Sequence, residues 1–410
     1  WASYGFRLHP QRGVSGEARV IAYAQRLDHP IQRVLITEAA RWHLLPESYL
    51  YGLADVGFTA GFSHTYIFGH VYPHGQWFYF PVAFLIKSTL SLLLLLLLVP
   101  FAIALRGARH RRELAFVIIP AAIYLAVAMA SGLNIGVRHI LPTYPFLMIL
   151  AGWGAAEVIA QKRRFAYAVV IVLLFGIFSS LRVFPVYLAY ANELWGGPAN
   201  TYKYLSDSNA DWGQQLKAVK KYLDQRHVKN CWFADFAAVV TDPQYYGIPC
   251  KPLTTIASVW LQPSIEVPAS IDGPVLISAG TLSGYEFGPD QLNPYDQFTR
   301  LHPTAVIEYG VFVYDGHFDI PLAAALNHVT QSQLQEKAGH LDLALAEAQA
   351  AVQLAPNSVQ AEAQLGHILT KLGWTDDARQ AYQRALQAAQ TIHPELQKGW
   401  IPGLHSAMGQ

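Results

Sequence analysis

The stretch from Ser91 to Leu105, SLLLLLLLVPFAIAL, limits what this chain can fold into more than any other part of the sequence. A helix of this composition has no polar face for water, so it fits a membrane interior better than the surface of a soluble domain. Each apolar run of this kind is near the ~20 residues that cross the ~30 Å hydrocarbon core of a bilayer. Four such runs are present, over residues 78–105, 114–130, 140–160 and 165–184. The sequence therefore predicts a polytopic α-helical membrane protein with four transmembrane helices in residues 78–185.

The charge content agrees with a chain that is part membrane protein and part soluble protein. Charged side chains make up 14% of the 410 residues, against roughly 25% in a typical soluble domain. The shortage is concentrated between Trp77 and Pro185. A net charge of +1 argues against binding to nucleic acid, which normally requires a basic surface. The chain begins at Trp1 and shows no signal peptide, so we expect it to be the C-terminal portion of a longer protein.

Two short basic loops set the predicted orientation. One spans residues 106–112 and carries four arginines, and the other reads Lys162-Arg163-Arg164. Short loops rich in Lys and Arg face the cytoplasm. Residues 1–77, the loop near 131–139 and everything after Pro185 are therefore predicted to lie outside the cytoplasm.

Residues 1–77 form a predicted extracytoplasmic segment with interfacial helices. Helical periodicity in residues 16–27 and 31–45 suggests helices that lie on the membrane surface or pack over the bundle. Glu47 and Asp55 could line a substrate cleft, with a solvated face as the alternative for each. The histidines at positions 64, 70 and 74 lack a carboxylate or cysteine that would complete a metal site, so no metal is assigned.

Residues 186–318 are predicted to form a small extracytoplasmic α/β domain. An amphipathic helix in residues 211–227 precedes β-rich runs at residues 230–240, 273–280 and 304–316. Cys231 and Cys250 are the only two cysteines of the chain. Outside the cytoplasm they could form a disulfide, and two buried free thiols are the alternative.

Residues 319–390 contain an internal repeat, followed by a tail at 391–410. Gly339 and Gly373 are 34 positions apart, and so are Ala344 and Ala378. A 34-residue helix–turn–helix period is typical of tetratricopeptide (TPR) repeats. Only about two repeats are present, so we expect them to lean on the α/β domain, a partner protein or a second copy of the chain.

Three cationic or titratable residues near the predicted outer membrane surface form a candidate anion site. Arg138 and His139 directly precede the third apolar run, where the amino end of a helix favours negative charge. Lys87 lies in the first apolar run, and an ionisable residue at membrane depth marks a functional site by default. General anchoring to lipid phosphates explains these residues equally well.

Three longer stretches point to a family. They are LPESYLYGLADV with GQWFYFPVAFLIKSTLSLLLLL, then GVRHILPTYPFLMILAG, then YLAYANELWGGPANTYKYLSDSNADWGQQLK, in this order over about residues 45–220. In these stretches the chain resembles the C-terminal part of GT-C membrane glycosyltransferases, of the protein O-mannosyltransferase and lipid A aminoarabinose transferase type.

The resemblance implies an enzyme of the bacterial inner (cytoplasmic) membrane that uses a sugar linked to polyprenyl phosphate as donor. The acceptor would be a lipid, glycan or protein on the extracytoplasmic side. Arg138 matches the basic residue before the LPxYPF-like segment, with His139 supporting it, and Lys87 matches the lysine of a KTP-like segment. That segment here reads Lys-Ser-Thr, without the proline of the family pattern.

The resemblance leaves the catalytic residues unassigned, because the acidic residue of these enzymes lies in a first extracytoplasmic loop that has no counterpart here. No cofactor is assigned, and nothing indicates a divalent metal. The alternative function is a non-catalytic membrane-anchored subunit whose repeats dock a partner membrane complex. A transporter is less favoured, because the paired interrupted helices expected of one are not evident.

Overall fold

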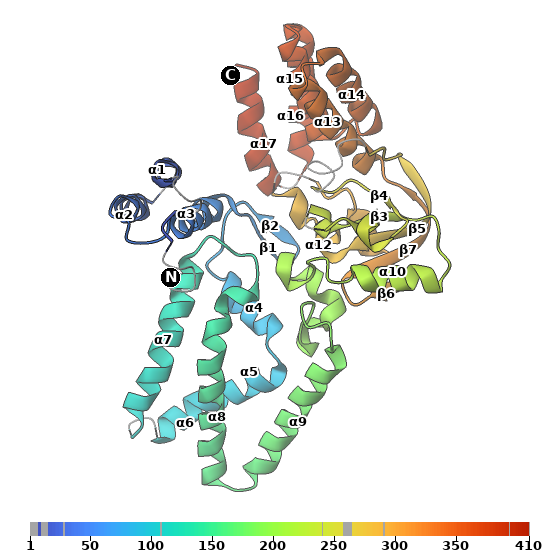
Figure 1. Cartoon of the computed structure of the whole chain (residues 1–410). Coiled ribbons are helices and arrows are strands. Elements are labelled where there is room, and N and C mark those ends of the chain that lie inside the picture. The colour runs from blue at the N-terminus through green and yellow to red at the C-terminus, as the bar shows by residue number, and fades with distance from the viewer. Residues whose placement is uncertain are drawn as a thin grey trace.

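The computed structural model describes residues 7–9, 15–27, 29–106, 109–239, 241–256, 265–289, 292–392 and 394–409. The other positions, Trp1 among them, lie outside the described residues. The chain is mostly helical, with one small sheet region between a lower block of long helices and an upper stack of helices (Figure 1).

The lower block holds the helices that could cross a membrane. Three of the described helical segments are long and apolar enough to do so, or up to four if a bent pair counts as one span. The elements of this block are α4 (Tyr79–Lys87), α5 (Leu90–Leu96), α6 (Leu98–Arg106), α7 (Arg111–Ala130), the 3₁₀ helix η2 (Val137–Thr143), α8 (Tyr144–Gln161) and α9 (Phe165–Val183).

The first apolar run is not the single straight helix predicted for residues 78–105. It bends by 115° between α4 and the following helical segment. The bend frees backbone carbonyls at the end of α4, and such groups need partners at membrane depth. Asn192 provides them: its side-chain amide donates to the carbonyl oxygens of Leu85 and Ser88 over 2.7 and 2.9 Å. Its backbone N–H donates to the carbonyl oxygen of Ile86.

The two basic connections lie at the same end of the block. The connection from α6 to α7 and the connection from α8 to α9 are both at the lower end, opposite the sheet region (Figure 1). The predicted orientation requires this arrangement.

The N-terminal segment is a three-helix cluster followed by a hairpin. Its elements are α1 (Glu17–Ala24), α2 (Pro30–Arg41), α3 (Glu47–Phe62), β1 (Thr65–Ile67) and the antiparallel β2 (His70–Tyr72). A small core around Val20 and Leu50 joins the three helices. The opposite face of α2 is apolar and exposed, with Ile31 at 73% and Leu35 at 64% accessibility, and Trp42 directly after the helix at 72%.

The sheet has five strands in the order β4–β3–β5–β7–β6. The strands are β3 (Trp232–Ala234), β4 (Lys251–Pro252), β5 (Ser270–Ser278), β6 (Ala305–Ile307) and β7 (Val311–Asp319). β3 runs parallel to β4 and β5, whereas β7 runs antiparallel to β5 and β6. The run predicted as a strand over 230–240 is therefore shorter, because η6 (Phe236–Val239) follows β3.

Both faces of the sheet are buried. Alternate residues of β5 enter different cores, with Val275 and Ile277 on one face and Leu276 on the other. Helix α10 (Leu216–Gln225) contributes Val219 to the second core. Because the carboxyl ends of parallel β3 and β5 meet at one edge, the segments that follow them lie together, and such an edge is a common place for ligands.

The C-terminal part is a stack of helices in which each contacts the next. They are α13 (Pro321–Lys337), α14 (Leu341–Leu354), α15 (Val359–Lys371), α16 (Thr375–Thr391) and α17 (Pro394–Ala407). Ala344, Ala348 and Ala381 are fully buried where helices meet, so small side chains set the close packing. Gly339 and Gly373 end α13 and α15 with φ of 85° and 80°, a conformation that glycine adopts without strain.

Candidate functional site

Arg138 lies at the upper end of the lower block of helices, in η2, where the block meets the loop of residues 206–215. Its guanidinium is 5.9 Å from the centre of the Trp212 ring. Trp212 is 44% exposed, so the two side chains form an open surface. Within the described residues Arg138 forms no ion pair and no side-chain hydrogen bond. Five N–H donors are therefore free to bind an anion.

Lys87 lies at the end of α4 and is held by backbone groups. Its ammonium donates hydrogen bonds to the carbonyl oxygens of Leu188 and Asn209 over 2.6 and 2.5 Å. An ammonium has three donors, so these contacts leave one for a ligand. Lys87 thus joins α4 to two segments that lie more than 100 positions further along the chain.

Asn209 brings the two cationic candidates into one site. It is fully buried. Its side-chain oxygen accepts from the backbone N–H of Val137 over 3.0 Å, next to Arg138. Its side-chain amide donates to the hydroxyl of Tyr79 over 2.7 Å, while its carbonyl accepts from Lys87. One residue therefore fixes η2 and α4 relative to each other.

Asp207 supplies a carboxylate beside Arg138. It has φ of 55°, a left-handed conformation that is uncommon outside glycine and often found at functional sites. One carboxylate oxygen accepts from the backbone N–H of Ser208, and the other accepts from the hydroxyl of Tyr285 over 3.1 Å. Burial raises the pKa of Asp207, while these two donors and the charge of Arg138 act in the opposite direction.

Behind Asp207, three further acidic residues are buried at the edge where β3 and β5 end. Asp211 accepts from the backbone N–H groups of Gly213 and Gly280. Burial raises the pKa of Asp235 well above its usual range, and the nearby Asp211 raises it further. Burial also raises the pKa of Glu286 to about 7. Protonated carboxyl groups are favoured here, since unpaired charges are costly in a buried position.

The third predicted lipid-phosphate residue, His139, is half-buried. Its ring lies 6.3 Å from that of Phe80, and its Nε2 is buried without a partner among the described residues. The structure therefore brings Arg138 and Lys87 together around Asn209, and gives His139 a packed position beside them.

Glu47 and Asp55 belong to the N-terminal helical cluster rather than to this site. Glu47 is buried and accepts hydrogen bonds from the backbone N–H of Gly16 and the Ser15 hydroxyl, and its carboxylate lies 2.8 Å from His9. Burial raises its pKa, but these three partners outweigh burial and hold the pKa below its usual value. Asp55 is exposed and accepts from the hydroxyl of Tyr23.

Metal and thiol chemistry add little to the site. Across the described residues no group of three or more His, Cys, Asp or Glu side chains is arranged to hold a metal ion.

Of the two alternatives for the cysteines, the structure has the disulfide: Cys231 and Cys250 are joined, with Cα atoms 4.4 Å apart. The bond links the starts of β3 and β4, away from Arg138.

Sequence reasoning missed Asp207, Asn209 and Trp212 as site residues. They belong to the run SDSNADWGQQ, in which Ser206, Asp207, Ser208, Asn209, Asp211 and Gln215 are all buried. Polar runs are normally exposed, so composition alone suggests a loop in water. The available signal was the density of side chains that can hydrogen-bond to backbone within a short segment.

Comparison with protein-family models, with curated proteins and with solved structures finds no match for this chain. The geometry of the site is therefore the basis for a functional conclusion. It defines an exposed arginine at the end of a helical block, with an aromatic ring and a buried carboxylate beside it.

Proposed function

We propose that this protein is a membrane glycosyltransferase of the GT-C type that uses a sugar linked to polyprenyl phosphate. In this proposal α7, α8, α9 and the bent α4–α6 segment lie in a bacterial cytoplasmic membrane. The sheet domain and C-terminal helices lie outside the cytoplasm, where a sugar is transferred to a lipid, glycan or protein acceptor.

The free guanidinium of Arg138 carries this proposal. A polyprenyl phosphate places its tail among membrane helices and its phosphate at their ends, and Arg138 has this position relative to α8. Its planar donors match two phosphate oxygens, and they stabilise negative charge as the phosphate leaves. Asp207 and Trp212 act as positioning residues, through charge and through ring contact respectively.

The Trp212 ring is also suited to contact the sugar of the proposed donor. Sugar rings have an apolar face that packs against aromatic side chains, and Trp212 is exposed beside the proposed phosphate position. The Phe236 ring lies 5.9 Å from Trp212 and the Tyr285 ring lies 6.2 Å from Phe236, so the aromatic surface continues toward Asp207.

We further propose that α13–α16 are tetratricopeptide-like repeats. Helices α14 and α16 begin at residues 341 and 375, and α13 and α15 end at residues 337 and 371. Both intervals are 34 residues, the period of that repeat. These helices would hold an acceptor or partner protein near the membrane site.

The test of the main proposal uses the full-length gene product in liposomes and a labelled polyprenyl-phosphate hexose. We expect Arg138→Ala to weaken donor binding by roughly 10- to 100-fold, since a charged hydrogen bond contributes about 1.5–3 kcal/mol. Arg138→Lys should recover part of the binding, because it keeps the charge without the planar pair of donors.

Arg164→Ala is the matched control, since Arg164 also flanks an apolar helix but lies at the opposite end of the block. Donor binding that is equal in wild type and Arg138→Ala would refute the phosphate role. Donor binding without sugar transfer to any lipid, glycan or protein would favour the non-catalytic subunit instead.

A further inference from the structure

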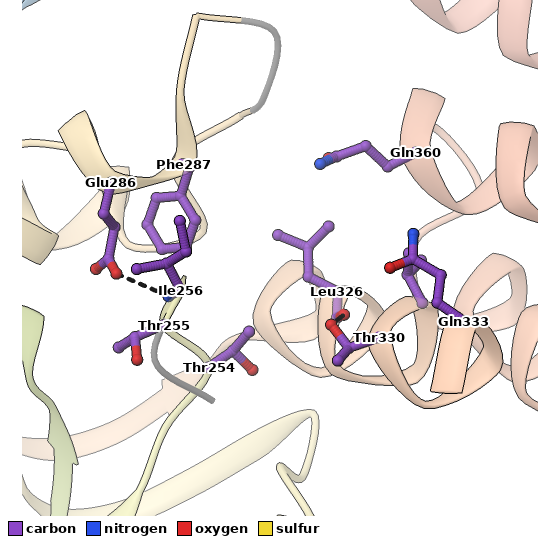
Figure 2. A pocket seen from close by; sticks show the side chains of 10 residues that line it. Thr254, Thr255, Ile256, Glu286, Phe287, Leu326, Thr330, Gln333 and Gln360 are labelled. Carbon is purple, nitrogen blue, oxygen red and sulfur yellow. Dashed lines mark hydrogen bonds between the residues drawn. The ribbon is translucent and has the colours of Figure 1, made fainter. Parts of the chain in front are cut away.

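A pocket of about 230 Å³ lies between the sheet domain and the first C-terminal helices, apart from the Arg138 site. Figure 2 shows its walls, which come from the segment after β4, from the 3₁₀ helix η8 (Tyr285–Phe287), and from α13 and α15. The pocket is smaller than the roughly 300–1,000 Å³ of sites for drug-sized ligands, so it holds one small group. Its lining residues are Thr254, Thr255, Ile256, Glu286, Phe287, Leu326, Val329, Thr330, Gln333 and Gln360.

The charge of the lining excludes an anion. Among the described residues that line the pocket there is no Lys, Arg or His, and Glu286 is the only ionisable one. One oxygen of Glu286 accepts from the backbone N–H of Ile256 over 2.8 Å (Figure 2). The other is buried and has no hydrogen-bond partner among the described residues. A phosphate or carboxylate would meet this carboxyl group with nothing to neutralise it, so the pocket suits a neutral ligand.

Gln360 indicates that the ligand is polar. Its side chain is 9% exposed, and within the described part of the chain its amide makes no hydrogen bond. Figure 2 shows this amide extending from α15 toward the pocket. The amide atoms are accessible from the pocket, so they can donate to and accept from a polar ligand.

The polar groups are spread around the pocket rather than along one line. Gln360 and Gln333 come from two helices, Thr255 from the segment after β4, and Glu286 from η8. An extended peptide would need polar partners along one direction, at the spacing of a strand. A sugar ring carries hydroxyl groups around its whole edge, and its flatter faces pack against side chains such as Phe287 and Leu326.

We propose that this pocket binds one neutral sugar residue. The hydroxyl groups of the sugar would bond with the side-chain amides of Gln360 and Gln333. Adjacent residues of η8 serve both sites: Tyr285 donates to Asp207 beside Arg138, while Glu286 lines the pocket. The binding chemistry does not depend on the proposed transfer reaction.

The test uses the whole chain in lipid nanodiscs, without sugar-based detergent, and saturation-transfer NMR. The probes are methyl glycosides of glucose, galactose, mannose and N-acetylglucosamine. We expect saturable binding of at least one of them, about tenfold weaker in Gln360→Ala. Gln333→Ala should also weaken it, and because Gln333 is exposed this second variant keeps its fold.

Two controls separate this proposal from others. Gln353→Ala changes an exposed glutamine of α14 outside the pocket, and it should bind the glycoside as wild type does. Arg164→Ala, which changes the residue before α9 outside both sites, should also leave glycoside binding unchanged. The proposal is overturned if folded wild type binds none of the four glycosides, or if Gln360→Ala and Gln333→Ala bind them normally. Displacement of the glycoside by a short neutral peptide, in a Gln360-dependent way, would reassign the pocket to peptide.

Discussion

The ammonium of Lys87 donates a hydrogen bond to the backbone carbonyl oxygen of Asn209 over 2.5 Å, although 122 positions separate the two residues. The bond fastens the end of α4 to the loop that carries Asp207 and Trp212. The upper end of the lower helical block and the edge of the sheet are thereby fixed as one unit. A ligand that reaches Arg138 meets groups from both.

Replacement of Asn209 by alanine should destabilise this junction. It leaves the Val137 N–H and the Tyr79 hydroxyl without their partner, and each unsatisfied buried group costs about 1–3 kcal/mol. We expect a lower midpoint of thermal unfolding in micelles. Asn200→Ala is the control, since its amide donates a solvent-exposed hydrogen bond to the nearby Gly196 carbonyl. Equal midpoints for the two variants would contradict the role of Asn209.

Stability should fall as the pH rises toward neutrality because of Glu286. Its pKa is raised by burial to about 7 from an ordinary value of 4.5, so the folded state holds this proton more tightly than the unfolded state does. The stabilisation is complete below about pH 4.5 and is lost as the pH rises through about 7, on the order of 3 kcal/mol. Urea unfolding at pH 5, 6, 7 and 8 measures this dependence. In Glu286→Gln the free energy of unfolding should decrease less over this pH range than in wild type. An identical pH dependence in the two proteins would contradict this role of Glu286.

Loss of the Cys231–Cys250 bond should destabilise the sheet domain. The two cysteines are 19 positions apart, and closing a loop of this size contributes about 3 kcal/mol. Cys231→Ser/Cys250→Ser should therefore unfold at lower temperature than the oxidised protein and match the reduced wild type. Thiol titration of the denatured protein checks the starting state, because these are the only cysteines. If the denatured wild type, never exposed to reductant, contains two reactive thiols, the Cys231–Cys250 disulfide is contradicted.

The exposed apolar face of α2 should rest on lipid. A spin label at Val34→Cys, which lies on this face, is expected to be accessible to oxygen and protected from a water-soluble nickel reagent in nanodiscs. The same label at Asp342→Cys, an exposed position of α14, should show the reverse. Equal access of the nickel reagent at both positions would show that α2 faces water.

Much of the architecture was predictable from local patterns. The apolar runs placed α7, α8 and α9 within a few residues, since twenty apolar residues in a row leave few alternatives to a long helix. The interval of 34 residues located the paired C-terminal helices, because glycine ends a helix in the same way each time it recurs.

The sequence by itself determined which segments are apolar helices, the approximate positions of β3, β5 and β7, and that Arg138 precedes one apolar run while Lys87 lies within another. Only the tertiary structure decided what surrounds them. The bend after Lys87 depends on Asn192, and the loop that carries Asp207, Asn209 and Trp212 is buried by segments from three parts of the chain. The physical reason is that helix and strand periodicity is a local property, whereas a buried polar group is stable only where distant residues supply its hydrogen bonds.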